Sequence, residues 1–477
     1  MTTTPEPATI PQPGSPPGGR QPLPPTFRRL LVNTLATGVT SSFLWFALTF
    51  WVFLETRSVV ATGVIGGAFS ISAALLGPFF GTFVDRHRKH AALVLTSMLS
   101  TVCFAAAAGL YAAVGTERIL QLGRPWFWLL VATTLLGSVA GQMRGIALST
   151  CVTLLVPPAD RDRANGMVGT ITGLSFAITS VFSGLVIGSL GMGWALYGSL
   201  ALTVGALAHV LTIRFDEPEP EAPDPGQPRR PMVDVAGAIE AIRAVPGLSL
   251  LVALAAFNNL LGGVFLALMD AYGLSLVSVE VWGLLWGFIS LAMIGGGVVV
   301  ARRGLGRSPV RVVVLGDLVN WTMCALFPVR SSIVLLTVGM VVWLSLMPAI
   351  EAAEQTVLQR AIPYERQGRV FGFAQLVENA ASPLTAFLVA PVAEAVFMPL
   401  MTDGAGARLI GDWYGVGPER GLALMFTLAG LAGAVVTAAV LRSSPYRRLA
   451  AATSGPESTA PPEGSDGTEE GEGTPPG

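Results

Sequence analysis

Several charged residues interrupt the long apolar stretches of this sequence, where charge is costly. We single out Glu351, Glu354, Glu378 and Arg144. Charged side chains inside a membrane-spanning stretch usually face the protein interior or an aqueous path, and they often carry protons or ions. Glu351 and Glu354 are three residues apart, so a helix presents them on one face. We therefore interpret the three glutamates as candidates for proton coupling, with Arg144 as a counter-charge. The alternatives are anchoring at the membrane interface and, for Glu378, a structural bond to a neighbouring helix.

Neutral polar and aromatic residues in other apolar stretches are candidates for binding a substrate. They are Asn33, Asn258, Asn259 and Trp343. The asparagines can hydrogen-bond a ligand, and the indole can pack against an apolar one. Hydrogen bonds between helices, or a lipid-facing position for Trp343, are the alternatives.

The composition indicates a helical protein that crosses a membrane many times. The chain has 477 residues, of which 52% are hydrophobic and only 12% are charged, and its mean hydropathy is +0.62. Soluble domains carry about 25% charged residues. The net charge of −1 argues against a nucleic-acid partner. The three cysteines have no metal-ligand spacing, and the sequence contains no phosphate-binding loop or catalytic triad. We therefore expect a protein without a bound cofactor and without enzymatic activity.

Twelve apolar runs are long enough to cross a bilayer as helices. They lie near 30–54, 59–83, 91–113, 126–150, 165–189, 192–213, 248–271, 281–301, 309–329, 331–356, 370–399 and 420–441. We therefore predict an all-α membrane protein with twelve transmembrane helices in two pseudo-symmetric six-helix bundles. The expected segments are a disordered tail (1–27), a first bundle (28–214), a linker (215–246), a second bundle (247–442) and a second disordered tail (443–477). Within the linker, Asp234 is placed to cap a short amphipathic helix on the membrane surface.

An internal repeat supports the division into two bundles. Pro157, Arg163 and Gly166 recur at the same spacing as Pro363, Arg369 and Gly372, and Gly81 and Arg86 recur as Gly297 and Arg302. Ala301 replaces the acidic residue of the first copy. Parallel repeats are typical of transporters whose site lies where the halves meet. Most of the 29 basic residues fall in loops on one side of the alternating runs, which predicts cytoplasmic termini.

The segment Gly81 to His90, which reads G-T-F-V-D-R-H-R-K-H, resembles the signature loop between helices 2 and 3 of the major facilitator superfamily. The resemblance rests on Gly81, Asp85, Arg86 and Lys89, and it implies that they gate the cytoplasmic side. The alternative is an ordinary basic loop whose charges only set the topology. Asp85 would contact the start of helix 11 near 370–373. Arg86 and Lys89 would pair with acids such as Asp160 or Asp162. Helices 4 and 10 face each other in that family, so Arg144 would bridge to Glu351 and Glu354.

The loop L-V-P-P-A-D-R-D-R-A-N-G-M, from Leu155, is similar to that of the bacterial drug-efflux branch that includes macrolide efflux proteins and enterobactin exporters. The resemblance implies a monomeric transporter of the bacterial inner membrane, which exports a small apolar compound in exchange for protons by alternating access. The stretch 176–188 lacks the Gly-Pro pair of many drug antiporters. The alternatives are a siderophore or lipid exporter, an uptake symporter, and a non-transporting sensor or assembly partner. The long outer loop 399–420 either caps the mouth or only links two helices.

Overall fold

The computed structural model describes residues 22–56, 59–217 and 233–453, and this part of the chain is helical throughout, without strands. The long helices are α1 Pro25–Thr56, α2 Val59–Arg86, α3 Lys89–Val114, α5 Pro125–Leu155, α6 Arg161–Ser189, α7 Met192–Leu211, α9 Leu248–Leu276, α10 Val279–Arg303, α11 Pro309–Leu326, α12 Ile333–Ala361, α13 Tyr364–Val392 and α16 Pro418–Arg442. The shorter ones are α4 Thr116–Ile119, α8 Val235–Ala244, α14 Met398–Thr402, α15 Ala405–Tyr414 and α17 Ser444–Thr453. In the described residues, eleven segments are long and apolar enough to cross a membrane, and α6 is the long helix that is not among them. The predicted all-α fold is confirmed.

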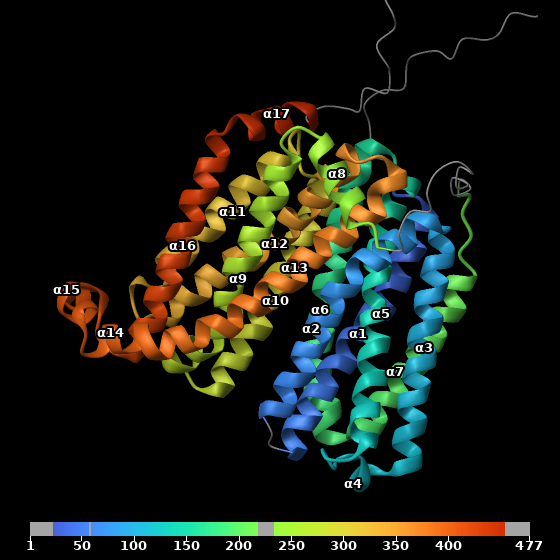
Figure 1. The fold of residues 1–477 in the computed structure, drawn as a ribbon, viewed down its shortest axis with the longest axis horizontal. Coiled ribbons are helices and arrows are strands. Elements are labelled where there is room, and N and C mark those ends of the chain that lie inside the picture. The colour runs from blue at the N-terminus through green and yellow to red at the C-terminus, as the bar shows by residue number, and fades with distance from the viewer. Residues whose placement is uncertain (1–21, 57–58, 218–232, 454–477) are drawn as a thin grey trace, which may run out of the picture.

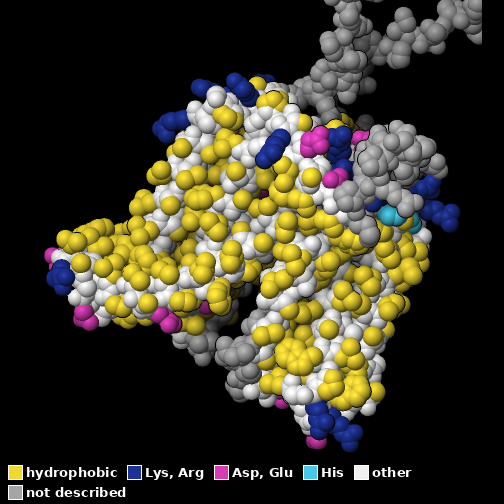
Figure 2. All heavy atoms as spheres, viewed as in Figure 1, with side chains coloured by type: hydrophobic (Ala, Val, Ile, Leu, Met, Phe, Trp, Pro, Cys, Tyr) yellow, Lys and Arg dark blue, Asp and Glu magenta, His cyan; other side chains and the backbone are white. Residues whose placement is uncertain are grey.

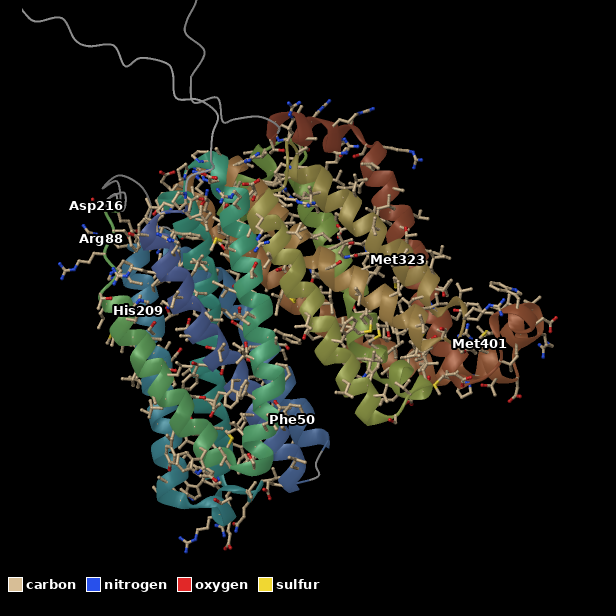
Figure 3. The ribbon with its side chains drawn as sticks, turned by 180° about the vertical axis from the view of Figure 1, so that it is seen from behind. Phe50, Arg88, His209, Asp216, Met323 and Met401 are labelled. Atoms are coloured by element: carbon tan, nitrogen blue, oxygen red, sulfur yellow. The ribbon has the colours of Figure 1, made fainter. Side chains whose placement is uncertain are left out.

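Two helical bundles meet at one end and diverge at the other (Figure 1). Helices α1 to α7 pack together in the first bundle, and α9 to α16 form the second. The bundles touch through α2 with α13 and through α6 with α10 and α12. We call the end that carries α8 and α17 the linker face, and the end where the bundles part the open face. Seen from behind, Arg88 and Asp216 lie at the linker face, whereas Phe50 lies toward the open face (Figure 3).

Hydrophobic side chains cover the sides of both bundles, as expected of surfaces that meet lipid (Figure 2). Basic side chains gather at the linker face, and a smaller group lies at the open end of the first bundle. Between the two bundles, the surface is hollowed toward the open face. The molecule therefore adopts an arrangement that is open on one side only.

The contact between α2 and α13 depends on glycines spaced four apart on both helices. A Cβ added to Gly81 would lie 2.2 Å from the carbonyl oxygen of Gly368, and one added to Gly372 would lie 2.3 Å from that of Gly77. Small residues at this spacing let helix backbones approach closely. The equivalent pair α6 and α10 is similar, because a Cβ on Gly297 would lie 2.7 Å from the backbone nitrogen of Thr170. The repeat in the sequence thus appears in space as two related helix crossings.

The connecting segments differ in part from the prediction. Asp234 caps α8 as expected, since its side chain accepts a hydrogen bond from the backbone N–H of Gly237. However, α8 packs against α13 instead of lying only on the membrane surface. The second tail was predicted to be disordered from 443, but residues 444–453 form α17, which buries Leu449 and accepts a bond from Arg360 at the carbonyl of Thr453. The first tail was predicted to be disordered through 27, but α1 begins at Pro25, and Leu23 and Phe27 are buried. The tail residues 1–21 and 454–477 lie outside the described part.

The outer loop 399–420 folds into α14 and α15 at the open end of the second bundle (Figure 1), away from the hollow that Figure 2 shows between the bundles. Arg420 holds it there. Its guanidinium is buried, donates to the carbonyls of Pro328 and Val329, and lies 4.2 Å from the ring centroid of Tyr414. This position fits a connection between two helices better than a cap over the mouth.

Candidate substrate cavity and the contacts that close it

A cavity of about 970 Å³ lies between the two bundles, and we call it the central cavity. Its walls come from α1, α5 and α6 on one side and from α9 to α13 on the other. It is large enough for a drug-sized ligand. Of the predicted ligands, Asn258, Asn259 and Trp343 line it.

The acidic residues of the central cavity all come from the second bundle. Among the described residues that line it, four are acidic, namely Asp270, Asp317, Glu351 and Glu354, and none is Lys or Arg. Glu351 and Glu354 thus share one face of α12, as their spacing predicts. Asp270, near the open face, is exposed and accepts a bond from the indole of Trp282 at 3.0 Å.

Asp317 is the acid that the sequence reading overlooked. It lies in the middle of α11, is 6% exposed, and accepts a hydrogen bond from Nδ2 of Asn258 at 2.7 Å. Asn258 in turn accepts from the indole of Trp321 at 2.9 Å. A lone acid in an apolar helix is the same signal that drew attention to Glu351. The chain Trp321–Asn258–Asp317 fixes one carboxylate of the cavity with a neutral partner.

Aromatic rings form the wall next to this chain. Trp343 lies 4.6 Å from Phe265 and 5.1 Å from Trp321, measured between ring centroids, and the two indoles meet edge to face. Such arrangements are favourable and rigid. The cavity therefore combines an apolar aromatic wall with carboxylates, which suits a ligand with a sizeable apolar body.

The predicted bridge from Arg144 to Glu351 and Glu354 is not what the structure shows. Arg144 is 4% exposed and donates to Oγ of Ser97 at 3.2 Å and to Oδ1 of Asn33, all within the first bundle. Asn33 was predicted to contact a substrate, but its side chain is fully buried and is used for this bond and for one to the carbonyl of Ala206. Asn33 positions Arg144 and is not among the described residues that line the cavity.

Glu378, the remaining proton-coupling candidate, lies on α13. Its side chain is outside the described part of the structure. A role for Glu378 stays a prediction.

The linker face is closed by Asp85, whose carboxylate joins the two bundles. One oxygen accepts from the backbone N–H of Gly368 at 2.6 Å, and the other accepts from the backbone N–H and Nε of Arg369, both at 2.9 Å. Arg369 also donates to Asp234 of the linker at 2.6 Å. The family resemblance placed the partners of Asp85 near 370–373, and the observed partners, Gly368 and Arg369, lie slightly earlier in the chain. A buried ion pair whose members make several hydrogen bonds is costly to break.

The predicted pairing of Lys89 with Asp160 or Asp162 is wrong, and that of Arg86 stays a prediction. Asp160 pairs with Arg163, and Asp162 accepts a hydrogen bond from the backbone N–H of Leu305 at 2.8 Å. Both carboxylates therefore have partners other than Lys89. Lys89 is instead buried with its Nζ 4.9 Å from the ring centroid of Tyr364 on α13. Burial raises the pKa of the Tyr364 phenol, so the ring stays neutral and remains a cation–π partner.

A further polar contact joins the two bundles at the wall of the central cavity, which Asn165 and Ser149 line. Asn165 on α6 donates to Thr356 and to Gln359 of α12, both at 2.9 Å, and Gln359 donates to the carbonyl of Ser149 on α5 at 2.9 Å. These groups are buried and lie in different bundles. Sequence reasoning could not identify them, because neutral polar residues near helix ends are common.

Comparison with known proteins identifies the family. The chain matches the Major Facilitator Superfamily over residues 30–386. It is 25% identical over 317 residues to human solute carrier family 67 member A1, an alignment that covers 65% of this chain and 69% of the relative. Its fold is similar to that of the human organic anion transporter MFSD10, with a TM-score of 0.60 and 16% identity over 87% of this chain and 100% of the other. It is also similar to a bacterial homologue of the iron transporter ferroportin in an outward-facing state, with a TM-score of 0.64 and 16% identity over 87% and 99% of the two chains. The chain is a multi-pass membrane transporter of the Major Facilitator Superfamily.

Proposed function

We propose that this transporter exports a small, largely apolar organic compound in exchange for protons. The observation that carries the proposal is the central cavity, in which Asp317, Glu351 and Glu354 lie on one bundle beside an aromatic wall. Asp317 is buried and accepts a hydrogen bond from the neutral amide of Asn258, and such a carboxylate is stabilised by taking up a proton. Carboxylates that switch between charged and neutral forms are suited to coupling proton movement to a change of state.

In the proposed cycle, the structure corresponds to the state that faces outward. Asp85, Arg369 and Asp234 seal the linker face, while the central cavity communicates with the open face. Protons from outside neutralise the cavity acids after the substrate has left. The neutral cavity then lets the bundles rock, the contacts at Asp85 and Asn165 separate, and protons leave to the cytoplasm as the next substrate enters.

We place the linker face in the cytoplasm of a bacterial cell, at the plasma membrane. Most basic residues gather at this face, and basic residues favour the cytoplasmic side. The drug-efflux resemblance of the loop from Leu155 supports export. Among the structural relatives, one is titled an organic anion transporter and another a proton:xylose symporter, which is consistent with a small-molecule substrate and proton coupling. We expect a monomer to be sufficient, since the central cavity is built from one chain.

The test is proton flux in everted membrane vesicles with an acidified interior, read with a pH-sensitive dye. Macrolides, cationic dyes, siderophores and lysolipids are added in turn to the wild type and to Glu351→Gln and Glu354→Gln. We expect at least one compound to make the interior more alkaline, and at least one variant to abolish this response. Asp403→Asn, which changes an exposed acid in the outer loop, is the matched control and should respond like the wild type. If the folded and inserted protein showed no proton flux with any of the compounds, this result would contradict proton-coupled export.

A further inference from the structure

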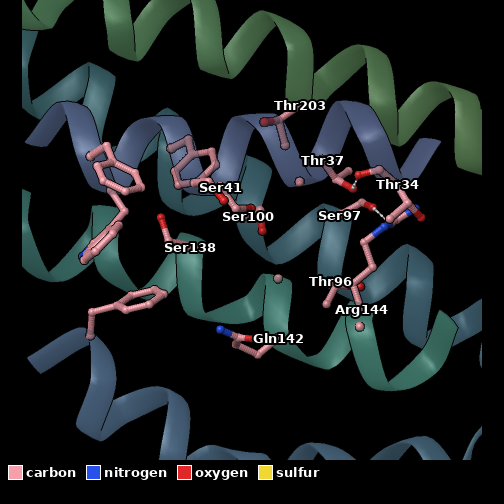
Figure 4. A pocket seen from close by; sticks show the side chains of 18 of the residues that line it. Thr34, Thr37, Ser41, Thr96, Ser97, Ser100, Ser138, Gln142, Arg144 and Thr203 are labelled. Carbon is pink, nitrogen blue, oxygen red and sulfur yellow. Dashed lines mark hydrogen bonds between the residues drawn. The ribbon is translucent and has the colours of Figure 1, made fainter. Parts of the chain in front are cut away.

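A second cavity, of about 440 Å³, extends into the first bundle, and we call it the side pocket (Figure 4). Thr34, Gln142 and Gly145 line both the side pocket and the central cavity, so the two are adjoining spaces. Arg144 lies at one end of the side pocket, and serines and threonines line its middle.

The side pocket collects buried polar groups that have no partner within the protein. In the described part of the chain, Nε of Arg144, Oγ1 of Thr34, Oγ of Ser138 and Nε1 of Trp45 are each buried without a hydrogen bond. All four residues line this one pocket. Buried donors are almost always satisfied in folded proteins, and leaving one unpaired is costly. Because all four groups lie at one pocket, a bound molecule is expected to supply their hydrogen-bond acceptors.

The charge of the side pocket determines what that acceptor is. The guanidinium of Arg144 is nearly fully buried, and the bonds it makes go to the neutral groups of Ser97 and Asn33. Among the described residues that line the pocket, none is Asp or Glu. A buried cation is stable only when it is paired. A ligand that brings its own negative charge would complete the site, and the forked guanidinium suits a planar carboxylate.

The other end of the side pocket is aromatic. Trp45 stacks on Phe69 with ring centroids 5.1 Å apart and meets Phe46 edge to face at 4.6 Å. Phe176 meets Phe46 edge to face at 6.3 Å. These rings would contact an apolar or aromatic body whose acidic group points to Arg144.

We propose that the side pocket binds an aromatic or similarly apolar carboxylate, with its acidic group on Arg144 and its body among Trp45, Phe46 and Phe69. This inference names a substrate class and so rests, for transport, on the function proposed above, but binding is independent of it. In this arrangement the first bundle binds the anion. The second bundle takes up protons through Asp317 and Glu351.

The experiment is isothermal titration calorimetry on the purified chain in phosphatidylcholine nanodiscs, with empty nanodiscs as the baseline. The probes are 2-naphthoate and its uncharged analogue 2-naphthamide. We expect 2-naphthoate to bind about tenfold more tightly, since a charge-assisted pair is stronger than a neutral one. Arg144→Gln should remove this preference. Ser138→Leu should weaken both probes by filling the pocket, and it leaves the bonds of Arg144 to Ser97 and Asn33 in place. Arg124→Gln, which changes an exposed arginine just before the same helix, should bind like the wild type.

Equal affinity for the two probes would overturn the proposal, because the pocket would then not recognise charge. Binding of 2-naphthoate that neither Arg144→Gln nor Ser138→Leu alters would overturn it as well, and the pocket would hold water only. Proton flux in vesicles without binding of 2-naphthoate would overturn the anion site and leave proton-coupled export standing. Binding without proton flux would support the anion site and contradict the function proposed above.

Discussion

Asp85 and Asp162 each close one of the two equivalent helix crossings of this transporter, but they lie on helices that do not correspond to each other in the repeat. Asp85 lies on α2 and accepts from the backbone N–H of Gly368 on α13. The repeat that aligns Arg163 with Arg369 also aligns Asp162 with Gly368, and the repeat that aligns Gly81 with Gly297 aligns Asp85 with Ala301. At the second crossing the small residue is therefore on α10, and the acid is Asp162 on α6, which accepts from Leu305 beyond the end of α10. The two repeats have exchanged the positions of their carboxylate and their small residue.

Asp85→Asn should shift the transporter toward a state that is open at the linker face. Both carboxylate oxygens accept hydrogen bonds, so one of them would be replaced by an amide nitrogen that faces the donors of Gly368 or Arg369. Loss of a charged hydrogen bond costs about 2 kcal/mol, or about 30-fold in the ratio of the two states. Spin labels at His87 and Arg303, exposed positions of the two bundles, would report the change as a longer distance component. The three native cysteines are buried, which favours selective labelling.

The control for this measurement is Asp216→Asn, which removes an exposed acid on the same face (Figure 3). Its distance distribution should match that of the wild type. If Asp216→Asn and Asp85→Asn behaved alike, the effect would come from the net charge of the face and not from the bonds of Asp85.

Ala301→Asp should destabilise the closed linker face, although it restores the acid that the first repeat carries. By the repeat, the introduced carboxylate would face Asp162, and two like charges at close range repel. Combining it with Asp162→Gly should recover part of the loss, because the pair would then match Asp85 and Gly368. We expect a coupling between the two changes of about 1 to 3 kcal/mol, obtained from the same spin-label distances in a double-mutant cycle. Strict additivity would show that the two crossings are not equivalent.

Gly81→Ala should lower the apparent melting temperature of the purified protein. The added methyl group would lie 2.2 Å from the carbonyl oxygen of Gly368, so the helices would have to separate. Overpacking of this kind costs about 1 to 3 kcal/mol. The matched change is Gly205→Ala on α7, where an added Cβ meets nothing within 4 Å, and there the melting temperature should stay the same or rise. A similar decrease in both variants would mean that helix flexibility matters more than the close crossing.

Local patterns predicted the helices and some of the residues that line the central cavity, but not the partners of these residues. The cap of α8 by Asp234 follows from its place before an amphipathic segment, because both partners are within one turn. Its ion pair with Arg369 joins residues far apart in sequence and needs the tertiary fold. Asn33 was misinterpreted for the same reason. A polar side chain in an apolar run can face a substrate or another helix, and only the fold shows that Arg144 takes its oxygen.

Asp317→Asn should separate proton-driven transport from substrate exchange. The amide keeps an oxygen that can accept from Asn258, so the chain to Trp321 stays intact, but it cannot bind and release a proton. In proteoliposomes, the variant should therefore exchange labelled for unlabelled substrate at a rate close to that of the wild type, while accumulation driven by a pH gradient falls at least about tenfold, as expected for loss of an essential proton carrier. Asn258→Leu provides the contrast, because it removes the bonds to Asp317 and Trp321 without removing the acid, and it should impair exchange as well. If Asp317→Asn accumulated substrate as well as the wild type, the proton would have to be carried by Glu351, Glu354 or Glu378, and Asp317 would serve only to hold the aromatic wall in place.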